Sequence, residues 1–181
     1  MQIIDFFRYI WYNGRNKDKT GDKNAFSQII SFINQDLYKI AKTKLSQESD
    51  IYDAIQETII AAYQSINKLS NYSKFKSWIY KILLNKCNDI YRAKYKFNTI
   101  SYDSNECEKF TSNTYEIENN IEFNNLLKIL NEDEKTIMIL YYLENYTSKE
   151  ISKILNIKEP TVRSKISRAK IKIKENYKEV L

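Results

Sequence analysis

Only two glycines and one proline occur in this chain of 181 residues. Average usage would give about 20 for a chain of this length. Glycine supplies the positive φ of tight turns and proline presets the turn backbone, so β-hairpins and glycine-rich phosphate loops have almost no residues to build them. We therefore predict an all-α protein.

Histidine is absent altogether. Histidine is the usual general base and the commonest metal ligand, so its absence removes the histidine-dependent triads and zinc hydrolases. Cys87 and Cys107 stand twenty positions apart, which fits neither a zinc site nor a redox C-x-x-C pair. We expect no enzyme, no metal, no cofactor and no small-molecule substrate. A helical enzyme remains an alternative, for which Asp53 and Glu57 are the only carboxylate pair at suitable spacing.

The opening stretch MQIIDFFRYIWY is apolar but short, and it contains Asp5 and Arg8. It lacks the basic start and small-residue cleavage site of a secretion signal, and it is too short to span a bilayer. We expect a cytoplasmic protein with reduced cysteines.

Charge is distributed unevenly along the chain. Residues 21–97 carry a net charge of +5 and residues 147–181 carry +6, whereas residues 98–121 carry −4. The run from 98 to 121 has no hydrophobic periodicity and is rich in Asn, Ser, Thr and Glu, which is typical of a flexible linker. We predict four segments: a helical N-terminal extension (1–20), a helical domain (21–97), an acidic linker (98–121) and a second helical domain (122–181).

The first domain is expected to contain three amphipathic helices, beginning near Ala25, Ile51 and Phe75. Apolar residues recur every three or four positions in each, as a buried helix face requires. The second helix carries a separate face of Asp53, Gln56, Glu57 and Ile60. The third carries a stripe of cations and amides, which can hold phosphates and base edges: Lys81, Asn85, Asn88, Arg92 and Lys96. Nearby aromatic residues serve either as core or as stacking surfaces for single-stranded nucleic acid: Phe75, Trp78, Tyr80, Tyr91 and Tyr95. For Trp78 we favour packing.

The second domain contains local signals for a helix-turn-helix. Asn131 with Glu134, and Thr147 with Glu150, have the spacing of helix-starting capping boxes, and Asn156 suits the left-handed end of a short helix. The next helix places Val162, Ile166, Ala169 and Ile173 on one face. Its opposite face would enter the major groove of DNA and consists of Arg163, Ser164, Ser167 and Arg168.

These motifs resemble the extracytoplasmic-function sigma factors of bacterial RNA polymerase, which keep only conserved regions two and four. The first domain contributes GDKNAF, DAIQE and FKSWIYKILLNKCNDIYR, and the second contributes TSKEISKILNIKEPTVRSKISRAK. Both occur in the family's order, with a linker and no third region between them.

The resemblance implies a role for each face. Asp53, Gln56, Glu57 and Ile60 would contact core RNA polymerase. Asn85 would capture a flipped base of the −10 promoter element, with Lys81, Asn88, Arg92 and Lys96 beside it on the strand. The −35 element would be read by the recognition helix through Thr161, Arg163, Ser164, Ser167 and Arg168.

The partners implied are core RNA polymerase, promoter DNA and an anti-sigma factor, which by family analogy is membrane-associated and releases the protein under envelope or other external stress. The alternative is a stand-alone helix-turn-helix repressor or activator, whose first domain would serve dimerisation or effector binding. DAIQE and the helix containing Asn85 discriminate between the two, because a repressor has no reason to carry them.

Overall fold

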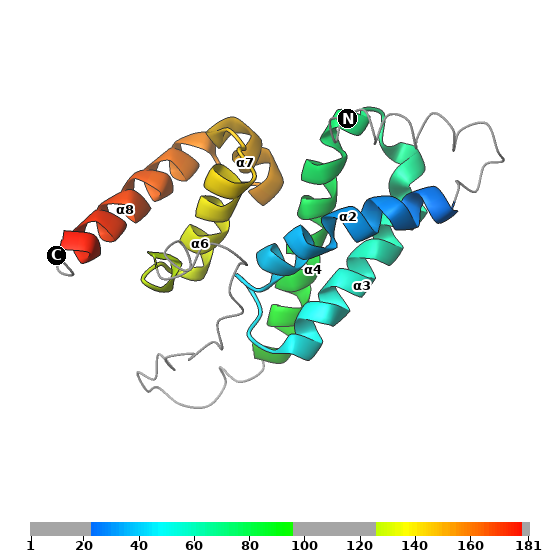
Figure 1. The fold of residues 1–181 in the computed structure, drawn as a ribbon, viewed down its shortest axis with the longest axis horizontal. Helices are drawn as coiled ribbons and strands as arrows, with labels where there is room; N and C mark the ends of the chain where they lie inside the picture. Colours follow the sequence, from blue (N-terminus) through cyan, green and yellow to red (C-terminus); the bar gives the residue numbers. More distant parts are fainter. Residues whose placement is uncertain (1–22, 96–125, 179–181) are drawn as a thin grey trace.

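The computed structural model describes residues 23–95 and 126–178, and every regular element in these ranges is a helix (Figure 1). The prediction of an all-α fold is confirmed. The predicted extension (1–20) and linker (98–121) lie outside the described residues, and the exact domain bounds stay predictions.

The N-terminal body consists of three α-helices and two short 3-10 turns. In chain order these are α2 (Lys23–Ala41), α3 (Glu48–Ser65), η1 (Ile66–Lys68), η2 (Tyr72–Lys74) and α4 (Phe75–Tyr95). Helix α3 begins three residues before the predicted Ile51, and the acidic Glu48 and Asp50 in its first turn complement the positive end of the helix dipole. It ends at Ser65, and the chain tightens into η1 before Leu69.

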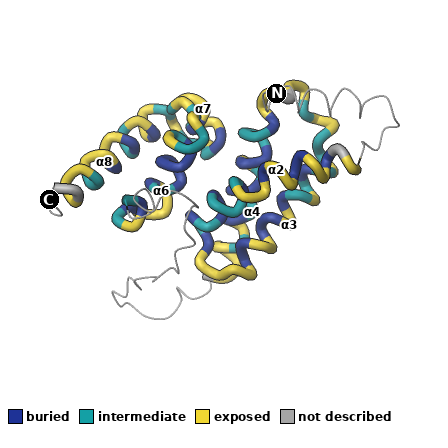
Figure 2. Tube along the Cα trace, in the orientation of Figure 1, coloured by how far each residue is buried: buried dark blue, intermediate teal, exposed yellow. Residues whose placement is uncertain are grey.

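The core of this body forms where α2, α3 and α4 pack along the stripes that the sequence pattern marks. The side chains of Ile33, Leu37, Ile51, Ile79 and Leu83 are essentially inaccessible to solvent. The opposite side of each helix is exposed, as the alternation of colours along α2, α3 and α4 shows (Figure 2). Each helix is therefore held by one face and leaves the other open to partners.

The C-terminal body consists of α6 (Glu132–Met138), the π-helical segment η4 (Ile139–Leu143), α7 (Ser148–Leu155) and α8 (Glu159–Lys178). Both predicted capping boxes are present. The Asn131 side chain accepts a hydrogen bond from the Glu134 backbone N–H and Thr147 does the same for Glu150, while each glutamate accepts from its capping residue's backbone N–H. These pairs satisfy amide groups that the start of a helix leaves unpaired.

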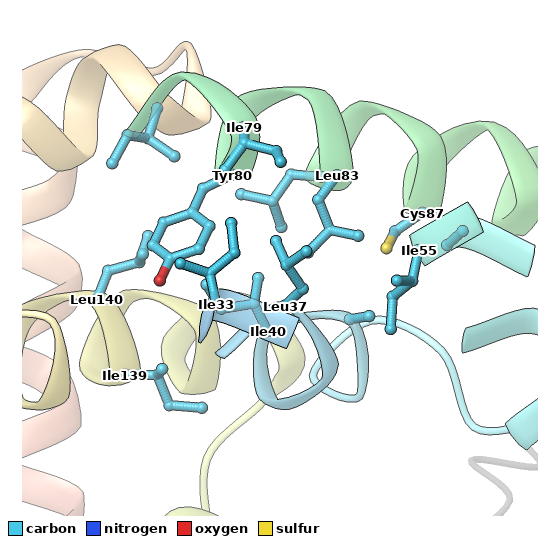
Figure 3. Packing of buried hydrophobic residues seen from close by; sticks show 14 of the residues in the cluster. Ile33, Leu37, Ile40, Ile55, Ile79, Tyr80, Leu83, Cys87, Ile139 and Leu140 are labelled. Carbon is cyan, nitrogen blue, oxygen red and sulfur yellow. The ribbon is translucent and has the colours of Figure 1, made fainter. Parts of the chain in front are cut away.

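The two bodies share one apolar core. The side chain of Leu140 in η4 lies beside Tyr80 of the N-terminal body, whereas Ile139 points to the other side of η4 (Figure 3). Tyr80 is completely buried there, and its ring meets Tyr146 edge-on with the ring centres 6.3 Å apart. The segment η4 and helix α7 are thus packed onto α4.

Candidate nucleic-acid and partner interfaces

The turn between α7 and α8 sets the direction of α8. Asn156 ends α7 in the left-handed conformation, at φ 55° and ψ 43°, as predicted. Asparagine tolerates this region better than most residues, because its short polar side chain can bond locally. The Asn156 and Ile157 N–H groups both donate to the Ser152 carbonyl, the latter at 3.1 Å. Val162, fully buried, then anchors the first turn of α8.

The outer face of α8 carries the residues predicted to contact a major groove. Thr161, Arg163, Ser167 and Arg168 are exposed, and Ser164 is half-buried. The Arg168 guanidinium donates to Ser164 Oγ at 2.7 Å, and Arg163 pairs with Glu159 at 3.1 Å. The structure therefore brings all five together on one surface, and side-chain contacts already orient both arginines along it.

Two acidic residues of α6 hold α8 from its other side. Asp133 Oδ2 lies 2.6 Å from Lys165 Nζ, and Glu134 Oε2 lies 2.8 Å from Lys172 Nζ. Asp133 Oδ1 accepts a further bond from Lys44 of the N-terminal body. Hydrogen bonds from Lys165 and Lys44 lower the pKa of Asp133 to about 2. Lys165 and Lys172 thus hold α8 against α6, whereas Arg163 and Arg168 lie on the outer face.

The cation and amide stripe of α4 is exposed as predicted. Lys81, Asn85, Asn88 and Arg92 follow one another at helical spacing on the solvent side of the helix. Lys96 lies outside the described residues. Side chains of this kind, in one line, suit a nucleic-acid strand that runs along the helix.

The aromatic residues of α4 divide between core and surface. Of the two alternatives, core packing holds for Phe75 and Tyr80, because both side chains are buried. Trp78 is half-buried and packs against Phe75, with ring centroids 5.8 Å apart. Tyr91 is 48% exposed, so its ring is accessible for stacking on a base. The side chain of Tyr95 is not described.

The outer face of α3 presents Asp53, Gln56, Glu57 and Ile60 to solvent. Ile60 is 56% exposed, although the rest of its surroundings on this face is polar. Glu57 pairs with Lys86 of α4 at 2.9 Å, which ties this face to the neighbouring helix. An acidic and amide face with one apolar side chain at its end is suited to contact a basic, partly apolar partner.

Sequence reasoning missed the buried carboxylate of Asp50. This residue is 1% exposed, its Oδ1 accepts from Lys94 near the end of α4, and its Oδ2 has no hydrogen-bond partner among the described residues. The signal was present: Asp50 stands four and eight positions before the buried Ala54 and Thr58, which places it on the core side of α3. The pair fixes the last turns of α4, where Arg92 lies.

Two conserved-domain models match the chain. "Sigma-70 region 2" matches residues 33–97, and "Sigma-70, region 4" matches residues 121–173. The matches cover the helical bodies in the family's order. The chain belongs to the extracytoplasmic-function (ECF) sigma factors of RNA polymerase. From here the N-terminal body is called region 2 and the C-terminal body region 4.

Curated relatives extend over nearly the whole sigma factor. The ECF RNA polymerase sigma factor SigW of Bacillus subtilis is 26% identical over 175 residues, covering 90% of this chain and 94% of its own. The ECF RNA polymerase sigma-E factor of Haemophilus influenzae is 29% identical over 164 residues, covering 83% of this chain and 86% of its own. Like other members of the family, this protein directs RNA polymerase to promoters and has no enzymatic activity of its own.

Solved structures share the fold. CnrH, in complex with the cytosolic domain of CnrY, superposes with a TM-score of 0.63 at 19% identity over 97% of this chain and 99% of its own. RpoE from Bartonella quintana, in complex with the anti-sigma factor NepR, gives a TM-score of 0.63 at 20% identity over 84% and 96% of the two chains. Among the helices described here, none is long and apolar enough to cross a membrane.

The lowered pKa of Asp133 predicts an acid-sensitive contribution to stability. The folded-state pKa of about 2 lies below the ordinary value of 3.8, so the contribution is complete above about pH 4 and is lost as the pH falls toward 2. We expect Asp133→Asn to be less stable than the wild type at pH 6 and to converge with it near pH 2. Urea unfolding followed by circular dichroism at several pH values measures this.

The matched control is Glu132→Gln, which removes a charge from the same helical turn. Glu132 shares the favourable position at the start of α6 with Asp133. A general dipole effect would affect both variants alike. If the Asp133→Asn curve instead ran parallel to that of the wild type across the whole pH range, the assignment of the contribution to the Lys44 and Lys165 pairs would be wrong.

Proposed function

We propose that this sigma factor uses three exposed helix faces for three tasks: α3 binds core RNA polymerase, α4 holds the opened −10 element, and α8 reads the −35 element. The observation that carries the proposal is the stripe on α4. Its cations and amides are exposed in one line while the opposite side of the same helix is the core of region 2. Such a helix can hold a nucleic-acid strand on its exposed side while the side chains on its buried side stay packed in the core.

Chemistry supports the role of α4 at the −10 element. Lysine and arginine neutralise phosphates, whereas asparagine can pair with the edge of an unstacked base. Asn85 lies between Lys81 and Asn88 on the exposed side, and Tyr91 offers an accessible ring farther along. Stacking a base on such a ring is worth about 1–3 kcal/mol, which offsets part of the cost of unstacking it from the duplex.

The α3 face supports docking on polymerase. Its acidic and amide side chains complement a basic surface, and Ile60 adds an apolar contact at the end of the face. An interface contact of this kind also explains why a large apolar side chain is exposed on an otherwise polar helix side. The stand-alone regulator is disfavoured because the region 2 model matches the whole span that carries this face.

Charge reversal on α3 tests the docking role. We expect the double variant Gln56→Ala, Glu57→Lys to lose at least tenfold in promoter-specific run-off transcripts with purified core polymerase, because a like charge at a docking surface is strongly unfavourable. Ile60→Ala should weaken polymerase binding while changing the free energy of unfolding by no more than about 0.5 kcal/mol. Binding of labelled protein to core polymerase gives the direct reading.

Two controls separate docking from folding. Lys86→Met breaks the same ion pair with Glu57 but leaves the α3 face intact, so its transcripts should stay near the wild-type level. Ile51→Ala, on the buried side of the same helix, should cost about 2–5 kcal/mol of stability. Undiminished polymerase binding by the Gln56 and Glu57 variant would refute the docking assignment.

Replacing arginine by lysine tests the α8 face, because this keeps the positive charge and changes the shape of the charged group. The double variant Arg163→Lys, Arg168→Lys retains two cations but loses the planar fork that bonds guanine edges or phosphates with two hydrogen bonds. We expect the preference for an intact over a scrambled −35 element to fall by about five- to a hundredfold, in line with about 1–3 kcal/mol for a bidentate contact. The salt dependence of binding should change little.

Run-off transcription from the two promoter versions measures this preference. The matched control is the double variant Lys165→Arg, Lys172→Arg. These two lysines contact Asp133 and Glu134 on the other side of α8, so this variant should keep the wild-type promoter preference. If the Arg163 and Arg168 variant kept the wild-type preference for the intact −35 element, the assignment of −35 recognition to these arginines of α8 would be wrong.

We also propose that an anti-sigma factor holds the protein inactive near the cytoplasmic membrane and releases it under envelope or other external stress. Support comes from the two structural neighbours, each solved with a second protein: CnrH with the cytosolic domain of CnrY, and RpoE with the anti-sigma factor NepR. The exposed α3 face is the surface that such an inhibitor would cover to exclude polymerase.

Fractionation of cells that produce the protein tests this regulation. We expect part of it in the membrane fraction of unstressed cells, and its transfer to the cytosolic fraction after envelope stress. Detergent-solubilised complex purified from that fraction should support at least tenfold less run-off transcription than the free sigma factor at equal concentration. A protein that is fully active and wholly cytosolic in unstressed cells would contradict the proposal.

A further inference from the structure

The first turn of α8 carries a carboxylate on a helix that is otherwise basic. Glu159 is the one acidic residue among positions 159–174, where six lysines and arginines occur. DNA phosphates carry negative charge and repel a carboxylate, so Glu159 weakens any surface whose task is only to grip the DNA backbone. Phosphate binding therefore does not account for this residue, and none of the tasks assigned above uses it.

The backbone of this turn is held firmly. The N–H groups of Thr161 and Val162 donate to the Lys158 carbonyl at 3.0 and 3.2 Å, and the Val162 side chain is completely buried. Pro160 has a fixed φ and lacks an N–H, which suits the first turn of a helix because an N–H there has no partner within the helix. The Glu159 side chain thus projects from a well-defined position, as discrimination between bases requires.

Glu159 and Arg163 form an ion pair on the surface of α8. Glu159 Oε1 lies 3.1 Å from Arg163 Nη2, and the two side chains are 34% and 72% exposed. Stacked base pairs are about 3.4 Å apart, so two charged groups at this separation can reach bases of one pair or of two neighbouring pairs. A guanidinium has five N–H donors, so its contact with Glu159 leaves donors for a base.

The pair lies in the row of side chains nearest the start of α8. Glu159, Arg163 and Ser167 follow at four-residue intervals, and each interval turns only about 40° around the helix, so the three form one line. In a helix-turn-helix, residues near the N-terminus of the second helix contact base edges in the major groove. Glu159 is the first residue of α8, so its carboxylate stands where base edges are contacted.

A carboxylate distinguishes the bases in the major groove because it can only accept hydrogen bonds. Guanine presents the acceptors N7 and O6, and thymine presents the acceptor O4, so both repel it. Adenine places the acceptor N7 beside its amino group. Cytosine presents only the donor N4 amino group. A carboxylate at this place in the groove therefore favours cytosine over the other three bases.

We infer that Glu159 accepts a hydrogen bond from the amino group of a cytosine in the −35 element, while Arg163 bonds a guanine of the same or the neighbouring base pair. The inference rests on the proposed function, because it requires α8 to read the −35 element. Glu159 is then a specificity-determining residue. Its charge lowers affinity for DNA in general, and the bond to cytosine offsets this loss only at the correct promoters.

Selection of promoters by the complete polymerase tests the inference. Core polymerase with the wild-type protein is offered a promoter library whose −35 element is randomised, and the bound fragments are sequenced. We expect one −35 position at which cytosine is preferred over adenine by at least about fivefold. Glu159→Gln should prefer adenine at that position, because an amide both donates and accepts as the adenine edge requires. Glu159→Ala should show neither preference there.

Two glutamates provide matched controls. Glu175→Gln removes a carboxylate from the same helix about 24 Å farther along, and it should keep the wild-type base preference at every −35 position. Glu132 is the first residue of α6, as Glu159 is of α8. Urea unfolding of Glu132→Gln and Glu159→Gln should therefore show similar small losses of stability, because each removes a negative charge from the start of a helix.

The outcomes distinguish this inference from the proposed function. Identical base preferences of the wild type and Glu159→Gln at every −35 position would overturn the role of Glu159. So would a loss of guanine preference in both Glu159 variants with no change at a cytosine position, because the carboxylate would then only orient Arg163. A wild-type polymerase complex without any −35 preference would instead contradict the proposed function of α8.

Discussion

The structure depends on the burial of one side of α4. Ile79, Leu83 and Cys87 pack into region 2 at the three- and four-residue spacing of a helix, and this fixes where every other side chain of α4 points. Asn85 faces solvent for that reason alone. Tyr80, one position after Ile79, falls between the buried and the exposed sides and meets region 4. The periodicity of a single helix therefore assigns one side to the core and one to the neighbouring body, and it leaves exposed the side that we propose holds a strand of DNA.

Local chemistry was predictable because its partners lie within four residues. The shortage of glycine and proline predicted an all-helical chain. Residue type and spacing predicted the two capping boxes and the left-handed conformation of Asn156. The helical spacing of residues likewise predicted which side chains of α8 are exposed. Interactions of this kind contain both partners in one short window of sequence, so propensity and periodicity are sufficient to find them.

Contacts between distant segments had no such signal. Tyr80 and Glu144 are sixty-four positions apart, and nothing near either residue indicates the other. An aromatic residue beside a polar stripe suits stacking on a base as well as core packing, which is why the sequence left both alternatives open for Tyr80. The π-helical turn at η4 was also not predicted, because a single wide turn changes the direction of later side chains while its apolar sequence, ILYYL, is equally typical of an α-helix.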